Sequence, residues 1–531
     1  MITERSIINF LLWTGGLVLG CYLATTTAYQ NYYPLLFTVG TVFLVFTFVV
    51  VRDRMCLFPL LGSFVGGKFN FLPFGLAAGD IGTVLLILYF MVTYIALQQR
   101  PIKTGPLYFF LPVLIIFSII FYHDHSFGLK AFGGTMEGSR PGVLILLTSI
   151  AYVCGINMPS PPALFLKNVP WFCFAIATIS SIPYIISTYV PSLTPYLFVV
   201  TNNVNADAYL DATTYSQYAD SSEIGRNNGQ AAIGGTLVLC LICYYPITTW
   251  WQPRRWFIGL LGLICCALVL SSGFRNNFVS FGLTVFLGIW CHYPWRSLII
   301  IPALVIALMA LSLSQQYHIL NLPLPIQRSL SFLPGSWDES VLSSTDSSNE
   351  FREEIERVYI QEYLYKSPWF GNGLTWDAAK YDELDYLAKT QETADHYYRS
   401  EFFITGKMFH TGWLSLYDIV GLVGSAAFIF LNLSMIWVSG RMVVDKNVDR
   451  TSPLFPLKVW TFIGCVTGMF GFFALFGDFK SAFPGLCYFM ILLFHLIRLD
   501  EQARREAGVP SPHQTFQMMG PKASMLGLGQ P

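Results

Sequence analysis

The sequence predicts an all-α polytopic membrane protein with about 12 to 14 transmembrane helices and one large periplasmic loop. Of its 531 residues, 54% are hydrophobic and only 12% are charged, whereas soluble globular domains are about 25% charged. Apolar runs of roughly 20 residues, the length that crosses a bilayer as a helix, recur along the chain. The formal net charge is zero, so the composition indicates no nucleic-acid partner.

Thirteen apolar segments are expected to span the membrane, and one further segment is ambiguous. The N-terminal region shows no convincing small-residue cleavage site, so the first segment is expected to be a retained anchor. The segment 55–68 is shorter and contains proline and glycine, so it is either a short crossing or a re-entrant piece. The other expected spans are 7–28, 34–51, 80–97, 106–122, 141–158, 169–190, 229–249, 256–271, 277–293, 297–314, 413–439, 456–476 and 480–498.

Basic residues predict the orientation of these spans, because cytoplasmic loops are enriched in Lys and Arg. If all the strong basic clusters lie on the cytoplasmic side, both termini are cytoplasmic and 55–68 has to cross. The long polar segment 315–412 then faces the outer side of the membrane. The clusters lie at 52–54, 98–103, 252–255, Arg296, 441–450 and 498–505.

This orientation divides the chain into four parts. Within the polar loop, 350–368 has apolar and aromatic residues at helical spacing, and Pro368 ends this expected helix. The tail after residue 500 is rich in Pro, Gln and Gly without periodicity and is expected to be disordered. The parts are an N-terminal transmembrane bundle (1–314), the periplasmic loop with short helices (315–412), C-terminal transmembrane helices (413–498) and a cytoplasmic tail (499–531).

The sequence predicts neither a metal site nor a cofactor. Most of the eleven cysteines fall inside apolar segments, where cysteine behaves as a small hydrophobe. Cys240 and Cys243 form a CxxC pair, but no histidine accompanies them. The histidines and aspartate at 123–125 are sequence neighbours whose side chains point apart, which makes a poor metal cage.

Ionisable residues at the expected outer ends of the spans are the main candidates for chemistry. Arg226 and Arg275 each stand next to an apolar span, and Arg352 begins the expected loop helix. His410 precedes the span that follows the loop, and Asp418 lies within that span. If the loop folds over the bundle, these side chains would converge above the membrane.

These residue types suit the transfer of a group from a lipid pyrophosphate. Arginine offers a fixed fork of donors that binds phosphate oxygens bidentately, and histidine has the ordinary pKa to accept a proton from a hydroxyl. Simpler interpretations exist for each residue. Arginines at helix ends often extend to lipid headgroups, a histidine is often structural, and Asp418 either lines the site or hydrogen-bonds a neighbouring helix.

The segment 410–424 (HTGWLSLYDIVGLVG) resembles a motif of the O-antigen ligase and O-antigen polymerase superfamily of bacterial envelopes. The family pattern is roughly H-N-x-Y-L-x-x-L-x-E-x-G-L-x-G. The histidine, the aromatic residue three positions later, the next leucine and both glycines are in register. The chain departs from it at Thr411 and Ile419, where the family has Asn and Glu, and has Asp418 one position before the family's Glu.

Motifs further upstream extend the resemblance to about residues 220–425, and the topology extends it to the whole chain. Arg352 followed by 368–373 (PWFGNG) is similar to the family's Arg and P-x-x-G-x-G. The family's S-x-S-R-G is matched at Ser272 and Arg275 but not at the other positions. Arg226 corresponds to an earlier family arginine.

The resemblance implies a multi-pass glycosyltransferase of the bacterial inner membrane that works in cell-surface polysaccharide biosynthesis. The donor would be a glycan on undecaprenyl pyrophosphate, presented at the periplasmic face. Transfer would invert the anomeric centre without a metal or cofactor. His410 would be the general base, and Arg275, Arg352 and Arg226 would hold the pyrophosphate.

Several alternatives stay open on the sequence. The acceptor hydroxyl belongs to a lipid core, to another lipid-linked glycan or to a protein, which distinguishes a ligase, a polymerase and a protein O-oligosaccharyltransferase. A transporter or flippase for lipid-linked sugars is the alternative from another class. A non-catalytic scaffold of an envelope complex is a third.

Overall fold

The second of two units carries almost all of the described structure. The chain divides into Met1–Met55 and Cys56–Pro531, and the description below concerns the second unit. The expected span 7–28 and nearly all of 34–51 lie outside the described residues, as does the tail from 507. The computed structural model describes residues 51–70, 76–95, 104–123, 140–204, 227–250, 252–374, 380–381, 383–384, 396–409, 411–445, 448–475 and 477–506.

The described residues are almost entirely helical, and they contain no β-strand beyond an isolated bridge between Phe69 and Thr201. Each expected span from 80–97 onward coincides with a helix. In chain order these helices are α4 (Ala78–Phe90), α5 (Leu107–His123), α6 (Arg140–Asn157), α8 (Val169–Tyr189), α11 (Asn228–Tyr244), α12 (Trp256–Ser271), α13 (Arg275–His292), α14 (Pro294–Gln316), α19 (Gly412–Val444), α20 (Phe455–Phe470) and α21 (Phe479–Glu506).

The lengths and composition of these helices confirm the class of a helical membrane protein. Four of the described helices are long and apolar enough to cross a bilayer. Several shorter apolar helices accompany them, among them α5, α11 and α12. The four long spans are Val169–Tyr189, Gly412–Val444, Phe455–Leu475 and Phe479–Ala503.

The ambiguous segment 55–68 is a short, bent piece. A 3₁₀ helix (η1, Arg52–Leu57) leads into the six-residue helix α3 (Phe58–Ser63). A Cβ on Gly62 would lie 2.6 Å from the Ala78 carbonyl oxygen, so this glycine lets α3 pack directly on α4. Phe69 then reaches Thr201, next to the end of helix α9 (Thr194–Val200).

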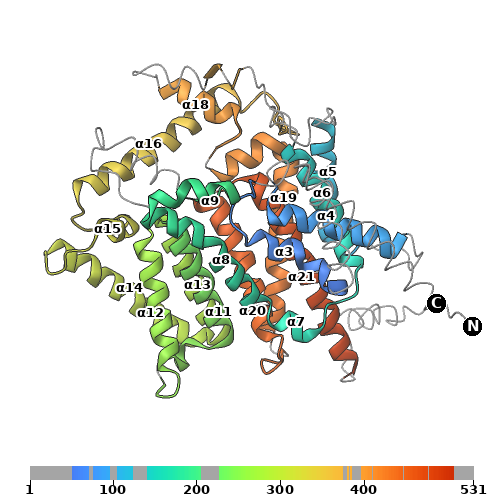
Figure 1. The fold of residues 1–531 in the computed structure, drawn as a ribbon, viewed down its shortest axis with the longest axis horizontal. Helices are drawn as coiled ribbons and strands as arrows, with labels where there is room; N and C mark the ends of the chain where they lie inside the picture. Colours follow the sequence, from blue (N-terminus) through green and yellow to red (C-terminus); the bar gives the residue numbers. More distant parts are fainter. Residues whose placement is uncertain are drawn as a thin grey trace, which may run out of the picture. The chain divides into compact units, whose positions relative to one another are not determined.

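The polar loop after α14 forms a small helical domain at one end of the bundle (Figure 1). It contains α15 (Leu324–Leu330), α16 (Glu339–Glu362) and α18 (His396–Thr405). α16 is the helix expected around 350–368, although it starts eleven residues earlier, because Asp338 caps it at the N-terminus. The prediction that Pro368 ends this helix is wrong, because the helix already ends at Glu362.

The loop domain and the basic segment 441–450 lie at opposite ends of α13. Arg275, the first residue of α13, hydrogen-bonds α16. His292, the last residue, has its carbonyl oxygen 3.4 Å from Arg450 Nη1, in the connection between α19 and α20. This arrangement agrees with the orientation expected from the basic clusters, which requires 315–412 and 441–450 to be on opposite sides.

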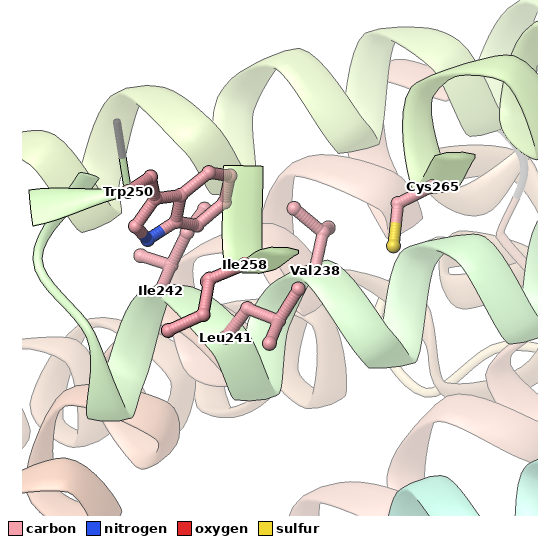
Figure 2. Packing of buried hydrophobic residues seen from close by; sticks show 6 residues of the cluster. All are labelled: Val238, Leu241, Ile242, Trp250, Ile258 and Cys265. Atoms are coloured by element: carbon pink, nitrogen blue, oxygen red, sulfur yellow. The ribbon is translucent and has the colours of Figure 1, made fainter. Parts of the chain in front are cut away.

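The packing of α11 against α12 holds the connection between these two helices, which contains Trp250. Figure 2 shows Trp250 against Ile242 and Ile258, with Val238, Leu241 and Cys265 further along the two helices. Trp250 Nε1 donates to the Tyr245 carbonyl at 2.8 Å. Gly262 is required here, because a side chain at this position would overlap the Trp250 ring. Burial of this apolar cluster orients α12 and thus the start of α13.

Candidate functional site

Arg275 is positioned by a tight turn between α12 and α13. Gly273 has a φ of 73°, a left-handed conformation that glycine adopts without strain. Phe274 then precedes α13 in an extended conformation. The Ser272 carbonyl accepts a hydrogen bond from Asn227 N at 3.0 Å, which ties the turn to the start of α11. The chain therefore presents Arg275 at the end of the bundle that faces the loop domain.

Arg275 contacts α16, the long helix of the loop domain. Its Nη2 donates to Asn349 Oδ1 at 3.2 Å, and Asn349 lies three residues before Arg352. Residues i and i+3 are neighbours on one face of a helix. Both arginine side chains are partly buried. Two arginines far apart in the sequence thus lie beside the same patch of α16.

The start of α16 is anchored at this end of the bundle. Ser329 Oγ in α15 donates to the Leu270 carbonyl of α12 at 2.8 Å. Asp338 accepts hydrogen bonds from the Ser340 hydroxyl at 2.6 Å and the Ser340 amide at 3.0 Å. These two bonds lower the pKa of Asp338. The cap is therefore ionised at neutral pH, which suits the positive end of the helix dipole.

The same face of α16 continues to the start of α19. Tyr359 follows Arg352 by two turns, about 10 Å along the helix. Its ring packs edge-on against Phe409 with the ring centroids 5.4 Å apart, and its hydroxyl donates to Asp418 Oδ1 at 3.2 Å. Burial, together with the Asp418 carboxylate, raises the pKa of Tyr359. The phenol therefore remains a hydrogen-bond donor.

Asp418 is a buried carboxylate with three side-chain partners. Asp418 is only 1% exposed. Lys407 Nζ forms an ion pair with Oδ2 at 2.5 Å, and Asn372 Nδ2 donates to Oδ1 at 2.8 Å, beside Tyr359. Lys407 has a φ of 56°, which is uncommon for a residue with a side chain. Of the two roles expected for Asp418, the structure thus favours hydrogen bonding to neighbouring elements.

Gly421 interrupts α19 immediately below this cluster. Its φ of 63° and ψ of −166° belong to a region that essentially only glycine occupies. The loop 368–373, here named the clasp loop, enters the break and binds both sides of it. In a continuous helix, Leu422 N would bond Asp418 O and Val423 N would bond Ile419 O. Here these four groups instead form four hydrogen bonds with the clasp loop. These are Asn372 N to Asp418 O (2.6 Å), Gly373 N to Ile419 O (3.1 Å), Leu422 N to Pro368 O (2.8 Å) and Val423 N to Trp369 O (3.1 Å).

The clasp loop also contacts α5. His123 Nε2 donates to the Phe370 carbonyl at 3.0 Å. A Cβ on Gly373 would lie 2.6 Å from the Cβ of His123, and a Cβ on Gly421 would overlap the backbone of Phe370 and Gly371. The clasp loop therefore joins the loop domain to two membrane helices at positions where only glycine fits.

The structure brings some of the sequence-predicted residues together. Arg275 and Arg352 share one patch of α16, and Asp418 lies two turns further along the same helix face, against Tyr359. Arg226 and His410 lie outside the described residues. Their described neighbours, Asn227 and Phe409, contact the Arg275 turn and Tyr359 respectively.

Sequence reasoning missed three partners of the site. Lys407, Asn372 and Tyr359 were not singled out, although all three bind Asp418. One signal was present: a carboxylate in an apolar span needs a partner, and Lys407 is the cation that precedes Asp418 most closely in the sequence. Asn372 lies between the two glycines of the clasp loop and reads as an ordinary turn residue.

A second buried carboxylate lies in the loop domain. Glu401 Oε1 accepts from the Tyr363 hydroxyl at 2.6 Å, and Oε2 pairs with Lys380 Nζ at 2.9 Å. Burial alone would raise the pKa of Glu401, but the hydrogen bonds from Tyr363 and Lys380 outweigh it and lower the pKa. Among the described residues, no group of three or more His, Cys, Asp or Glu side chains is placed to hold a metal ion.

Comparison with known proteins identifies no match among family models or curated proteins.

Proposed function

We propose that the chain is a membrane glycan transferase of the O-antigen ligase or polymerase type. The observation that carries the proposal is the hydrogen bond from Arg275 to Asn349, because it brings Arg275 to the helix that carries Arg352, at a position one turn before it. Neither the spacing of 275 and 352 in the sequence nor the apolar pattern requires Arg275 to contact this turn of α16. The contact supports a shared anion site at the end of the bundle that bears the loop domain.

In the proposed reaction, Arg275 and Arg352 bind the pyrophosphate of an undecaprenyl-linked glycan, with Arg226 as a third expected contact. Their guanidiniums stabilise the negative charge that grows on the leaving pyrophosphate as its bond to the anomeric carbon breaks. His410 takes the proton of the acceptor hydroxyl as the new glycosidic bond forms. The acceptor is a lipid core or another lipid-linked glycan, and the site faces the periplasm from the bacterial inner membrane.

A transporter of lipid-linked sugars is the second candidate. The interruption of α19 at Gly421 favours it, because transporters use discontinuous helices near the membrane midplane. In this protein, however, the clasp loop occupies the break and satisfies its backbone groups. The break also lies near the end of α19 that meets the loop domain, nine residues from Gly412. These features suit a rigid support for a site better than a substrate pathway.

The arginine pair gives a direct test of the proposal. Arg275→Ala and Arg352→Ala should each abolish the mature surface glycan and cause its lipid-linked precursor to accumulate, because the leaving pyrophosphate loses a stabilising charge. Removing one such donor from a preorganised site costs about 10² to 10³ in rate. The readout is the glycan ladder and the precursor pool of cells that carry each variant.

Arg357→Ala is the matched control. Arg357 lies on the exposed side of the same helix, 64% exposed, and pairs with Glu354. Its replacement should leave the ladder unchanged at equal protein level in the membrane. If Arg275→Ala and Arg352→Ala both give the wild-type ladder, the anion site has no role in transfer and the transferase proposal is lost.

A further inference from the structure

An open cavity of about 540 Å³ is lined mainly by residues of α8, α11, α13 and α20, together with Phe64, Gly66 and Asn203. Its volume is in the range of small-molecule sites in proteins. On α11 the lining runs from Asn228 to Leu239, about 16 Å along the helix, and on α13 from Asn277 to Thr284. These are the parts of both helices nearer the loop domain. The cavity is therefore one-sided, at the end of the bundle where Arg275 lies.

The polar groups of the cavity wall are uncharged. They are hydroxyl side chains from all four helices and three asparagines, and no Asp, Glu, Lys, Arg or His is among the described lining residues. The hydroxyl protons are largely used within the helices. Thr236, Thr284 and Thr467 each donate to the carbonyl four residues earlier, at 2.6, 2.9 and 2.8 Å. Their oxygen lone pairs remain as acceptors, so the wall is rich in acceptors.

Glycines leave the space open. A Cβ on Gly235 of α11 or on Gly468 of α20 would meet no atom within 4 Å, although both residues line the cavity. Close helix packing therefore does not explain them. Each is a position where a side chain would extend into free volume.

We propose that this cavity binds an uncharged, polyhydroxylated unit of the glycan, that is, a neutral sugar. Sugar hydroxyls are hydrogen-bond donors that match a wall of acceptor oxygens. A phosphate or carboxylate carries only acceptors at neutral pH and would find no cation there. The inference rests on the proposed function and deepens it, because it names a neutral sugar as the class of substrate group recognised.

The geometry of α13 separates the sugar site from the phosphate site. Arg275 contacts α16, whereas Asn277 lines the cavity and lies 3.4 Å from Asn228 of α11. Residues two apart on a helix point about 200° apart, so the two side chains face opposite sides of the first turn. A glycan chain at the cavity and a pyrophosphate at the arginines would flank this turn.

Binding to the purified full-length protein in detergent tests the inference. The probes are neutral trisaccharides (maltotriose, cellotriose and chitotriose) and inorganic pyrophosphate, each titrated by ligand-observed NMR. The variants Gly235→Leu and Gly468→Leu place a side chain in the cavity. The control Gly282→Leu adds the same side chain to α13. A Cβ on Gly282 also meets no atom within 4 Å, but Gly282 does not line the cavity.

We expect at least one trisaccharide to bind wild type and Gly282→Leu equally, and about tenfold more weakly to Gly235→Leu and Gly468→Leu. Pyrophosphate binding should be the same in all four proteins. Equal trisaccharide affinity in all four, or no trisaccharide binding to wild type, overturns the inference.

The outcome is separable from the test of the proposed function. If the cavity variants bind sugar normally while Arg275→Ala abolishes the glycan ladder, the neutral-sugar site is wrong and the transferase stands. If the cavity variants lose sugar while Arg275→Ala and Arg352→Ala cells both make normal glycan, the sugar site stands and the transferase is wrong.

Discussion

At the scale of single residues, the expected arginines and the unexpected partners of Asp418 are predictable to different degrees. Arg275 stands out in the sequence because it lies between two apolar spans, whereas Arg352 stands out through its place before the 368–373 motif. Asp418 stands out because a charge within an apolar span is rare. Its partners do not, since Lys407, Asn372 and Tyr359 lie in polar stretches where such residues are ordinary. Only the folded chain shows that three segments converge on one carboxylate.

The Lys407–Asp418 pair should contribute strongly to stability because the carboxylate is buried and the lysine is partly buried. Lys407→Met removes the cation and leaves the carboxylate with only neutral donors, which should destabilise the protein by about 3 kcal/mol or more. The measurement is thermal unfolding of the purified variant in detergent, compared with wild type.

The double variant Lys407→Met with Asp418→Asn is the control for this prediction. It removes both charges and keeps a group that can bond Tyr359 and Asn372, so it should be more stable than Lys407→Met alone. A double variant that unfolds at the same or a lower temperature than the single variant would show that the pair is not the source of the effect.

At the scale of helices, the apolar pattern predicts the spans well but misses the break in α19. Each expected span from 80–97 onward coincides with a helix, because apolar length is a direct requirement of the bilayer. Gly421 lies in an uninterrupted apolar run, where glycine usually indicates close helix packing. The break depends on the clasp loop, about fifty residues away in the sequence, which supplies the lost hydrogen bonds.

Gly421→Ala tests this interruption. The alanine Cβ would overlap the clasp loop and force a backbone conformation that costs about 1 to 3 kcal/mol. The variant should unfold at a lower temperature, and protease should cut the loop domain more readily. Gly282→Ala is the control, because Gly282 is helical and has open space around it. Equal stability of the two variants would contradict the role given to Gly421.

At the scale of the whole molecule, the distribution of basic residues predicts that the loop domain and the 441–450 segment lie on opposite sides of the membrane. In the structure they contact opposite ends of α13. We expect the loop domain to face the periplasm. Glu353→Cys on α16 and Asp449→Cys between α19 and α20 place a thiol at an exposed position on each end. The described native cysteines are buried or partly buried, so their background labelling should be low.

An impermeant maleimide added to cells with a permeabilised outer membrane should label Glu353→Cys and not Asp449→Cys, until the inner membrane is lysed. Labelling of Asp449→Cys alone would invert the orientation. Labelling of both before lysis would mean that the two positions are not separated by the membrane.

The proposed function depends most directly on His410, which only the sequence motif identifies. The decisive measurement is the surface-glycan ladder and the lipid-linked precursor pool of cells carrying His410→Ala. His318→Asn, at an exposed histidine of the same loop, is the control, because Asn tolerates the left-handed backbone found there. We predict that His410→Ala, at normal membrane level, loses the mature glycan and accumulates precursor while the control does not. A wild-type ladder from His410→Ala would contradict the transferase and favour the transporter.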